Sequence, residues 1–311
     1  MRVLVTGAAG FLGYAVAALL VEQGHQVTGL TRSEASALPE GVARLDGDLR
    51  APDTLLGAVV EADGVCHLAG LTKVRQSRTD PLGYWHTNLG GTLSILGQLA
   101  GARAGRLVLA STCTVYGEQA GQPISETATV APSSPYGTSK LAADHAAADL
   151  AATGAIGAIS LRAFNVAGAL PGHPDRDTTR LIPQLLAVQQ GHAPELVVNG
   201  DGTAVRDFVH VADMATAFAL ALRACEPGTW RAYNVGSGCP STVHDVITTA
   251  ETVTGRPVPR RHTAAAHEPA TLLADSTRIH SELGWRPDKS SLHEIISDAW
   301  TALNSDESPA E

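Results

Sequence analysis

Tyr136 and Lys140 stand four residues apart in the segment SPYGTSK and have the types needed to move a proton. On a helix, residues with this spacing share one face, so the lysine ammonium can lie beside the phenol. A free tyrosine has a pKa near ~10, and a neighbouring cation favours the phenolate. Ser111 and Thr112, at the end of an apolar run, offer a hydroxyl for the same substrate oxygen. The pattern predicts a tyrosine base, although helical tyrosines commonly only pack.

Three glycines, Gly7, Gly10 and Gly13, stand between a short apolar run and a helix-like segment. In dinucleotide-binding folds such glycines allow a tight turn, a close approach of the backbone to pyrophosphate, and close packing of the helix on the strand. The free N–H groups at the start of the helix add a site for phosphate. This context predicts a dinucleotide site at the N-terminus.

The residue type after the second expected strand bears on the choice of cofactor. An acidic residue is usual there and holds the ribose hydroxyls, but this chain has Thr31 and Arg32. Arg32 either meets a 2′-phosphate, which favours NADP, or stacks over adenine or points to solvent. Asp48 and Leu49, after the next strand, can line the adenine pocket. The sequence leaves the choice between NAD and NADP open.

An alternation of short apolar strands and helices has to position these groups. Such alternation predicts a parallel sheet with helices on both faces. The fold class we expect is α/β, a Rossmann-like doubly wound parallel sheet with a smaller C-terminal substrate-binding α/β region. The expected strands are 2–6, 26–30, 65–69, 107–111 and 158–162, and the expected helices are 14–23, 88–100 and 142–152.

Around residue 170 the chain changes to polar turns and short mixed elements, which suggests a second region. The expected division gives an NAD(P)-binding Rossmann domain over 1–170, completed by segments around 207–240. The substrate-binding region takes 171–206 and 241–303, and 304–311 forms a flexible tail.

The composition excludes several classes of protein. With 44% hydrophobic and 17% charged residues the chain is not intrinsically disordered. A net charge of -9 argues against binding nucleic acid, and no run of ~18 apolar residues predicts a membrane span. The four cysteines form no CxxC pair and no metal site, and no signal peptide is evident, so we expect a cytoplasmic protein.

An ordered series of motifs covers nearly the whole chain. It includes VTGAAGFLG, GDLR, HLAGL, STCTVYG, SPYGTSK, LRAFNVAGA, RLIP, GDGTAVRDFVHVAD, YNVGSG and LGWRP. The series resembles the extended short-chain dehydrogenase/reductase family, in particular its NAD-dependent nucleotide-sugar epimerases and dehydratases. The resemblance implies a Rossmann domain that holds NAD, or NADP because of Arg32, and a C-terminal region that binds a nucleotide sugar.

The resemblance also implies roles for individual residues. Tyr136 corresponds to the base, Lys140 to its partner and Thr112 to the helper hydroxyl. The implied cofactor contacts are Gly7, Gly10, Phe11, Leu12, Gly13, Thr31, Arg32, Asp48, Leu49, Leu68, Ala69, Gly70, Asn88, Ser111, Tyr136, Lys140 and Phe164. The implied substrate contacts are Thr72, Cys113, Thr114, Asn165, Leu181, Arg206 and Glu268.

Two positions separate the possible reactions. A dehydratase must expel water, which needs an acid, and family dehydratases carry an Asp-Glu pair directly after the strand-end threonine. Here Cys113 and Thr114 stand there, and FNVAGA and LGWRP look most like the motifs of bacterial UDP-glucose 4-epimerases. We therefore favour a nucleotide-sugar 4-epimerase. The alternatives are a dehydratase, an NADP-dependent reductase or dehydrogenase, and a cofactor-sensing protein that needs no base.

The groups that hold the substrate diphosphate are only partly predicted. Arg206 is a natural clamp for an anionic ligand in an acidic protein, although it can also be a surface ion-pair residue. Relatives usually place a second arginine shortly before Glu268, where this chain has alanines. Arg260, Arg261 or the basic loop 71–78 can compensate. Cys113 is either a weak donor to the sugar or a small buried residue.

The resemblance further implies a homodimer, because relatives commonly pair through two helices. The Ala-rich helices expected at 88–100 and 142–152 are the candidates, although such faces also pack against a sheet.

Overall fold

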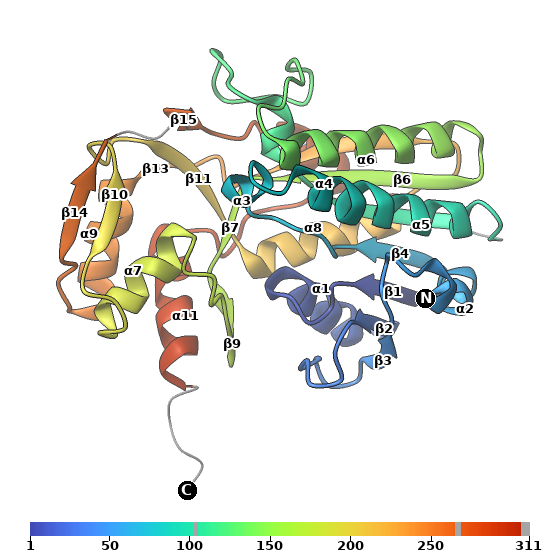
Figure 1. Cartoon of the computed structure of the whole chain (residues 1–311), viewed down its shortest axis with the longest axis horizontal. Coiled ribbons are helices and arrows are strands. Elements are labelled where there is room, and N and C mark those ends of the chain that lie inside the picture. The colour runs from blue at the N-terminus through green and yellow to red at the C-terminus, as the bar shows by residue number, and fades with distance from the viewer. Residues whose placement is uncertain (103–104, 265–268, 306–311) are drawn as a thin grey trace, which may run out of the picture.

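The central sheet of the computed structural model, which describes residues 1–102, 105–264 and 269–305, consists of seven parallel strands (Figure 1). Their order is β12-β6-β5-β4-β1-β2-β3. The strands are β1 (Arg2–Thr6), β2 (Gln26–Thr31), β3 (Ala43–Asp46), β4 (Gly64–His67), β5 (Gly105–Thr112), β6 (Ile156–Ala163) and β12 (Trp230–Val235). The chain crosses from β3 over β1 and β2 to β4, so the strand order reverses between β1 and β4. A ligand crevice is expected outside the carboxyl ends of the strands at this switch point.

Helices cover both faces of this sheet. On one face, α1 (Phe11–Glu22) and α8 (Val211–Ala224) share a buried cluster with Val3 and Val5 of β1. On the other, α2 (Leu56–Glu61), α5 (Gly91–Leu99) and α6 (Pro135–Ala152) enclose a cluster that contains Leu4. Alternate residues of β1 therefore point to opposite faces, as a strand requires. The predicted doubly wound α/β sheet is confirmed.

Short helical segments connect β4, α5, β5 and α6 above the carboxyl ends of the strands. A π-helical turn, η2, runs directly into α5, so the expected helix over 88–100 is divided between these two elements. The segments are α3 (Val74–Ser77), α4 (Pro81–Tyr84), η2 (Trp85–Gly90) and η3 (Cys113–Tyr116), and a further short turn, η1 (Pro52–Thr54), lies between β3 and α2.

A smaller α/β region lies beside the large sheet and is built around three short sheets (Figure 1). Its core contains Leu185, Phe208, Val246 and Ile295. The strands are β7 (Asn165–Ala167), β8 (Ala169–Leu170), β9 (His173–Pro174), β10 (Leu196–Asn199), β11 (Val205–His210), β13 (Pro240–Thr242), β14 (Arg260–Thr263) and β15 (Thr271–Leu272). The helices are α7 (Leu181–Gln189), α9 (Val243–Thr254) and α11 (Leu292–Ser305), whereas α10 (Thr277–Leu283) packs against β12 and α8 of the large sheet.

Strand β11 joins the two parts of the molecule. Its first half pairs with β13 and β15, its second half pairs with β7, and α8 follows it directly. Asp207 is fully buried at its centre, where it accepts hydrogen bonds from Ser237, Gly238 and Ala274. These bonds fix the loops around β11, and with them the position of the neighbouring Arg206.

Throughout the three described segments, no helix combines the length and the apolar character needed to span a bilayer.

Candidate active site

The turn from β1 into α1 leaves no room for side chains at Gly7 and Gly13. Gly7 has a φ of +71°, and a Cβ there would lie 2.8 Å from the backbone nitrogen of Ala69. A Cβ at Gly13 would lie 2.0 Å from the carbonyl oxygen of Gly7. The backbone therefore packs closely against Ala69 and against the first turn of α1, where the free N–H groups of a helix N-terminus can bind phosphate. This cradle fits the pyrophosphate of a dinucleotide.

A buried hydrogen-bond chain holds the loop after β4 against β1. The N–H groups of Leu68 and Ala69 both donate to Thr6 Oγ1, each over 3.1 Å. Thr6 Oγ1 lies 2.7 Å from His67 Nδ1, and His67 Nε2 lies 3.2 Å from Thr92 Oγ1. Burial lowers the pKa of His67 to about 3, so the imidazole is neutral. The histidine therefore acts here as a hydrogen-bonding link between elements.

Asn88, in the η2 turn, connects this loop to α6. Its Oδ1 accepts from the backbone of Leu71 over 2.8 Å, and its Nδ2 donates to Ser139 Oγ over 3.1 Å. A Cβ at Gly70 would lie 2.9 Å from Asn88 Oδ1 and 3.4 Å from Lys140 Nζ. Gly70, Asn88 and Lys140, all predicted to face the cofactor, therefore lie together.

Helix α6 presents Tyr136 and Lys140 on its buried side. Ser134 caps the helix by accepting from the backbone of Gly137, and Pro135 occupies the first turn. Tyr136 and Lys140 are 8% and 7% exposed, and the phenol is hydrogen-bonded to the side chain of Thr112. The structure thus brings together the three residues that the sequence predicts to be catalytic.

Burial acts on the two ionisable groups in opposite directions. It raises the pKa of Tyr136 to about 12, against the influence of the Thr112 hydrogen bond and of the Arg180 charge. It lowers the pKa of Lys140 to about 8, against the attraction of Asp144. The phenol is therefore protonated at neutral pH, and additional positive charge is needed to make it a base.

An ion pair lies almost fully buried beneath Lys140. Asp144 Oδ2 accepts from Arg162 Nε over 3.3 Å and from Ser111 Oγ over 3.1 Å. Arg162 also donates to the hydroxyl of Tyr116 over 2.9 Å. Ser111 therefore directs its hydroxyl toward this pair. Asp144 was not predicted, although its position four residues after Lys140 puts it on the same helical face.

The two residues after Thr112 carry no acid. Burial raises the pKa of Cys113 to about 12, so its thiol stays protonated at neutral pH. Thr114 donates its backbone N–H to Thr112 Oγ1, and the two side-chain oxygens lie 3.2 Å apart. Cys113 is thus a small buried group next to the Thr112 hydroxyl.

Three of the predicted substrate contacts, Arg206, Asn165 and Leu181, lie in the smaller region. Arg206 donates to the carbonyls of Val205 and Pro269, over 2.8 and 3.0 Å, and its charge reaches Cys113. Asn165 Nδ2 donates to the carbonyl of Asp207 over 2.9 Å, so β7 and β11 are tied at this point. Leu181 begins α7. Glu268 lies outside the described residues.

The remaining predicted contacts lie along the carboxyl edge of the large sheet. Phe164 follows β6 directly and is buried in one cluster with Cys113. Phe11 and Leu12 open α1, Thr31 and Arg32 end and follow β2, Asp48 and Leu49 follow β3, and Thr72 lies in the loop between β4 and α3.

Arg180 is a site residue that the sequence did not reveal, although it stands directly before Leu181 in the RLIP motif. Its NH1 lies 2.8 Å from Asp175 Oδ2, and its guanidinium carbon lies 6.0 Å from the centre of the Phe11 ring. Its charge lowers the pKa of Tyr136. Arg180 therefore lies between the phosphate loop and the proposed base.

Two further contacts fasten the same segment over the crevice. Lys73 Nζ, in the loop after β4, lies 3.4 Å from Asp177 Oδ1. The rings of His173 and Tyr14 stack with centroids 3.9 Å apart. The 173–180 segment is thus attached to both sides of the cofactor crevice.

The other two candidate cations are engaged elsewhere. Arg260 and Arg261 are both on β14, which pairs with β10 in the smaller region. Arg260 lies 3.4 Å from Glu251, and Arg261 lies 2.7 Å from Glu195. Both partners lie in the smaller region, and neither arginine has a described contact with a residue at the crevice.

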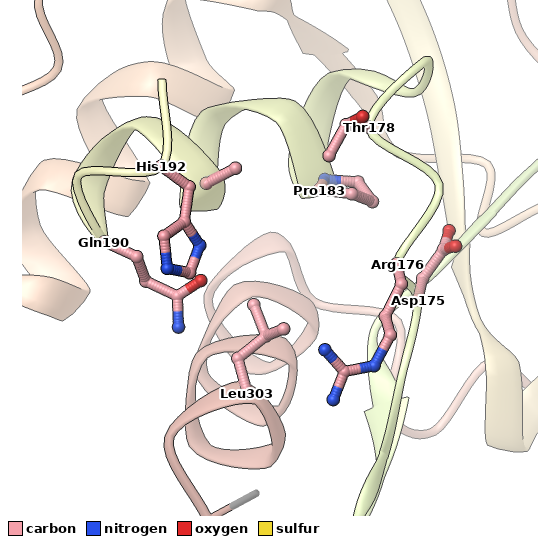
Figure 2. Close-up of a pocket in the computed structure, with 8 residues that line it drawn as sticks. Asp175, Arg176, Thr178, Pro183, Gln190, His192 and Leu303 are labelled. Atoms are coloured by element: carbon pink, nitrogen blue, oxygen red, sulfur yellow. The ribbon is translucent and has the colours of Figure 1, made fainter. Parts of the chain in front are cut away.

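A cavity of about 110 Å³ lies between α7 and α11, and none of the predicted site residues lines it. Figure 2 shows Arg176 turned toward Leu303 of α11, while the carboxylate of Asp175 points the other way. The Arg176 side chain therefore faces the cavity, whereas the carboxylate of Asp175 accepts a hydrogen bond from Arg180. In the part of the chain that the structure describes, no cluster of His, Cys, Asp and Glu could hold a metal ion.

Comparison with known proteins agrees with this geometry. A model of the NAD dependent epimerase/dehydratase family matches residues 3–236. The chain is 38% identical to the UDP-glucose 4-epimerases of Corynebacterium glutamicum and Streptomyces lividans, in each case over 96% of this chain and 95% of the relative.

A solved structure extends the similarity to three dimensions. It is UDP-glucose-4-epimerase from Stenotrophomonas maltophila with bound NAD and formylated UDP-arabinopyranose. The TM-score is 0.92 at 32% identity, and the match covers 98% of both chains. Because family model, relatives and fold all match over most of the sequence, this chain belongs to the NAD dependent epimerase/dehydratase family.

Proposed function

We propose that this protein is a nucleotide-sugar 4-epimerase of the UDP-glucose/UDP-galactose type that uses tightly bound NAD. The observation that carries the proposal is the buried group of Tyr136, Thr112 and Lys140 beside the glycine cradle. The relatives named UDP-glucose 4-epimerase, and the solved relative with NAD and a UDP-sugar, support the same reaction.

The proposed mechanism assigns proton transfer to Tyr136. A bound NAD would supply the hydride acceptor and donor for C4 of the sugar, so the reaction would consume no reductant. Tyr136 takes the proton of the 4-hydroxyl and later gives it back, while the Thr112 hydroxyl orients the same oxygen. The Lys140 ammonium favours the phenolate, and burial of the group excludes water.

The residues next to Thr112 favour epimerisation over dehydration. Elimination of water needs a proton donor for the leaving oxygen. Cys113, with its pKa raised to about 12, and the neutral hydroxyl of Thr114 are poor donors. A 4-epimerase needs no such group, since nothing leaves the sugar.

For the substrate diphosphate we propose Arg206, with Arg180 as the second cation. The position of Arg180 between Phe11 and Tyr136 supports this assignment, and the ion pairs of Arg260 and Arg261 argue against theirs. Thr72, Asn165, Leu181 and Glu268 remain proposed substrate contacts. The proposed division keeps the cofactor on residues 1–170, completed by 207–240, and the substrate on 171–206 and 241–303.

We propose that the enzyme is a cytoplasmic homodimer. Leu82 of α4 and Leu93 of α5 are 67% and 50% exposed, and an apolar face of this kind suits a second copy of the chain. Cys66, Cys113 and Cys225 are buried and free, which suits a reducing compartment.

The experiment that tests the proposed function compares Tyr136→Phe with wild type. Each protein is incubated with UDP-galactose without added reductant, and UDP-glucose is quantified by NMR. We expect kcat to fall by about 10²–10⁴-fold because the proton acceptor is lost. Tyr233→Phe, which removes a hydroxyl bonded to Glu282 on the other side of the sheet, is the matched control. Equal rates for Tyr136→Phe and wild type would exclude Tyr136 as the base.

A further inference from the structure

The acidic residue that usually binds the adenosine ribose is not present at the end of β2. In dinucleotide-binding folds an Asp or Glu at the end of β2 binds the 2′-hydroxyl, which selects NAD. Here β2 ends at Thr31 and is followed by Arg32. The structure, however, pairs Thr31 with Asp46 at the end of β3. The Thr31 hydroxyl lies 3.2 Å from Asp46 Oδ1, so a carboxylate lies beside the position of the missing acid.

The surroundings of Asp46 hold it in place and leave part of it accessible. Arg44 NH1 lies 3.7 Å from Asp46 Oδ1 and also donates to Thr31 Oγ1 and the carbonyl of Ser33. The Arg44 guanidinium is therefore occupied by groups of the chain itself. The Asp46 side chain is 49% exposed, and among the described residues no hydrogen bond reaches its Oδ2. One carboxylate oxygen thus remains able to accept from a ligand hydroxyl.

Arg32 is the other residue that could determine the choice of cofactor, since a guanidinium can bind a 2′-phosphate. The charge of Arg32, however, acts on the carboxylate of Asp48. Hydrogen bonds from Arg50, together with the charges of Arg50 and Arg32, lower the pKa of Asp48 to about 2. A 2′-phosphate at this edge would meet the carboxylates of Asp46 and Asp48, and like charges repel.

We propose that Asp46, supplied by the third strand, binds the adenosine 2′-hydroxyl and excludes a 2′-phosphate, so that it sets the preference for NAD over NADP. The inference rests on the proposed NAD-dependent function and assigns its cofactor selectivity to one residue. Strand β3 is the edge strand of the sheet. The residue that selects the cofactor therefore lies outside the β1–α1–β2 unit, which usually contains it.

The test measures nucleotide binding and needs no turnover. The full-length protein and the variants Asp46→Asn and Asp46→Ser are each incubated with equal concentrations of NAD and NADP. After unbound nucleotide has been removed, the bound fraction is released and both nucleotides are quantified by chromatography. Asp63→Asn, which neutralises an exposed carboxylate paired with Arg2 at the opposite end of the sheet, is the matched control.

We expect wild type and Asp63→Asn to hold mainly NAD, and both Asp46 variants to raise the ratio of NADP to NAD at least tenfold. An unchanged ratio in both Asp46 variants would overturn the proposal, as would a wild type that prefers NADP. A ratio that responds to Arg32→Ala and not to Asp46→Asn would also overturn it. Wild type that binds neither nucleotide would contradict the proposed function itself, whereas NAD binding without epimerisation would contradict only the reaction.

Discussion

Tyr136 and Lys140 occupy a site that costs the folded protein stability. The lysine keeps its charge at neutral pH in a nearly water-free environment, and Asp144 offsets only part of that cost. The same charge is what the phenol of Tyr136 needs in order to lose a proton. The arrangement is understandable as a functional one, because a structural site would favour an uncharged side chain at position 140.

We predict that Lys140→Met stabilises the nucleotide-free protein at pH 7 while it abolishes activity. The difference between the ordinary pKa of 10.5 and about 8 corresponds to about 3 kcal/mol. Between these pH values the unfolded chain binds more protons than the folded one, so wild-type stability rises with pH. The advantage of the variant is therefore complete below pH 8 and disappears toward pH 10.5.

Urea unfolding at several pH values measures this difference. Lys289→Met, at an exposed lysine, serves as the control and should follow wild type at every pH. A Lys140→Met variant that is less stable than wild type at pH 7, by an amount that does not change with pH, would contradict the account.

Arg180 should contribute to binding of the substrate diphosphate. We expect Arg180→Ala to weaken binding of UDP about 10–100-fold, since a hydrogen bond to a charged group contributes about 1.5–3 kcal/mol. Isothermal titration of the NAD-loaded protein with UDP measures the effect. Arg261→Ala, which breaks an ion pair on β14, should leave binding unchanged. If Arg261→Ala weakened UDP binding more than Arg180→Ala did, the second cation for the diphosphate would lie on β14 instead.

The residues predicted from the sequence are those whose role depends on local spacing. Tyr136 and Lys140 lie on one helix, and Gly7, Gly10 and Gly13 lie in the turn from β1 and the first turn of α1, so their geometry is implied by short-range structure. Asp46 could not be predicted, because its contact with Thr31 depends on the pairing of two strands.

The glycine cradle is the element on which we propose that cofactor binding depends. We predict that Gly13→Ala destabilises the protein by about 1–3 kcal/mol and reduces the amount of NAD that co-purifies. Its new methyl group would lie 2.0 Å from the carbonyl oxygen of Gly7, so the loop has to shift. Thermal unfolding and nucleotide content are the two measurements.

Gly97→Ala is the matched control, because it adds the same methyl group to a helix. No atom lies within 4 Å of a Cβ at Gly97, so we expect a gain of about 0.5–1 kcal/mol from helix propensity. If Gly13→Ala resembled Gly97→Ala in both measurements, tight packing at the cradle would not be needed.

Element boundaries were predicted less well than element types. The expected helix at 142–152 follows the alanine-rich stretch, whereas α6 begins at Pro135 because Ser134 caps it there. The capped turn carries Tyr136, so the part of this helix to which we assign a function is its polar beginning. Hydrophobic patterning alone finds the packed end of such a helix and misses the end that faces a ligand.

At the scale of the whole molecule, later parts of the chain complete structures begun earlier. Strand β12, from residues 230–235, extends the large sheet next to β6, and α8 packs against α1. Segments around 207–240 were predicted to complete the Rossmann domain, but the pairing of β12 with β6 was not, because strand pairing between distant segments leaves little local signal. The family motifs predicted the overall fold because they describe the complete arrangement.

The homodimer is a prediction that belongs to this scale. We expect Leu93→Lys to convert a wild-type dimer to monomer, because the charge would have to be buried at the α5 face. Analytical ultracentrifugation measures the mass. Val60→Lys, at an apolar residue of α2 that is 45% exposed, should remain a dimer. A monomeric wild type, or a dimeric Leu93→Lys, would exclude this interface.

The central claim is that the enzyme inverts C4 of a UDP-hexose without net redox change. The most direct measurement uses UDP-galactose labelled with deuterium at C4, with unlabelled NAD in solution and no added reductant. The account predicts UDP-glucose that retains deuterium at C4, in a mixture that approaches the same composition from either sugar. Absence of any C4 epimer, or transfer of the deuterium to NAD in solution, would contradict it.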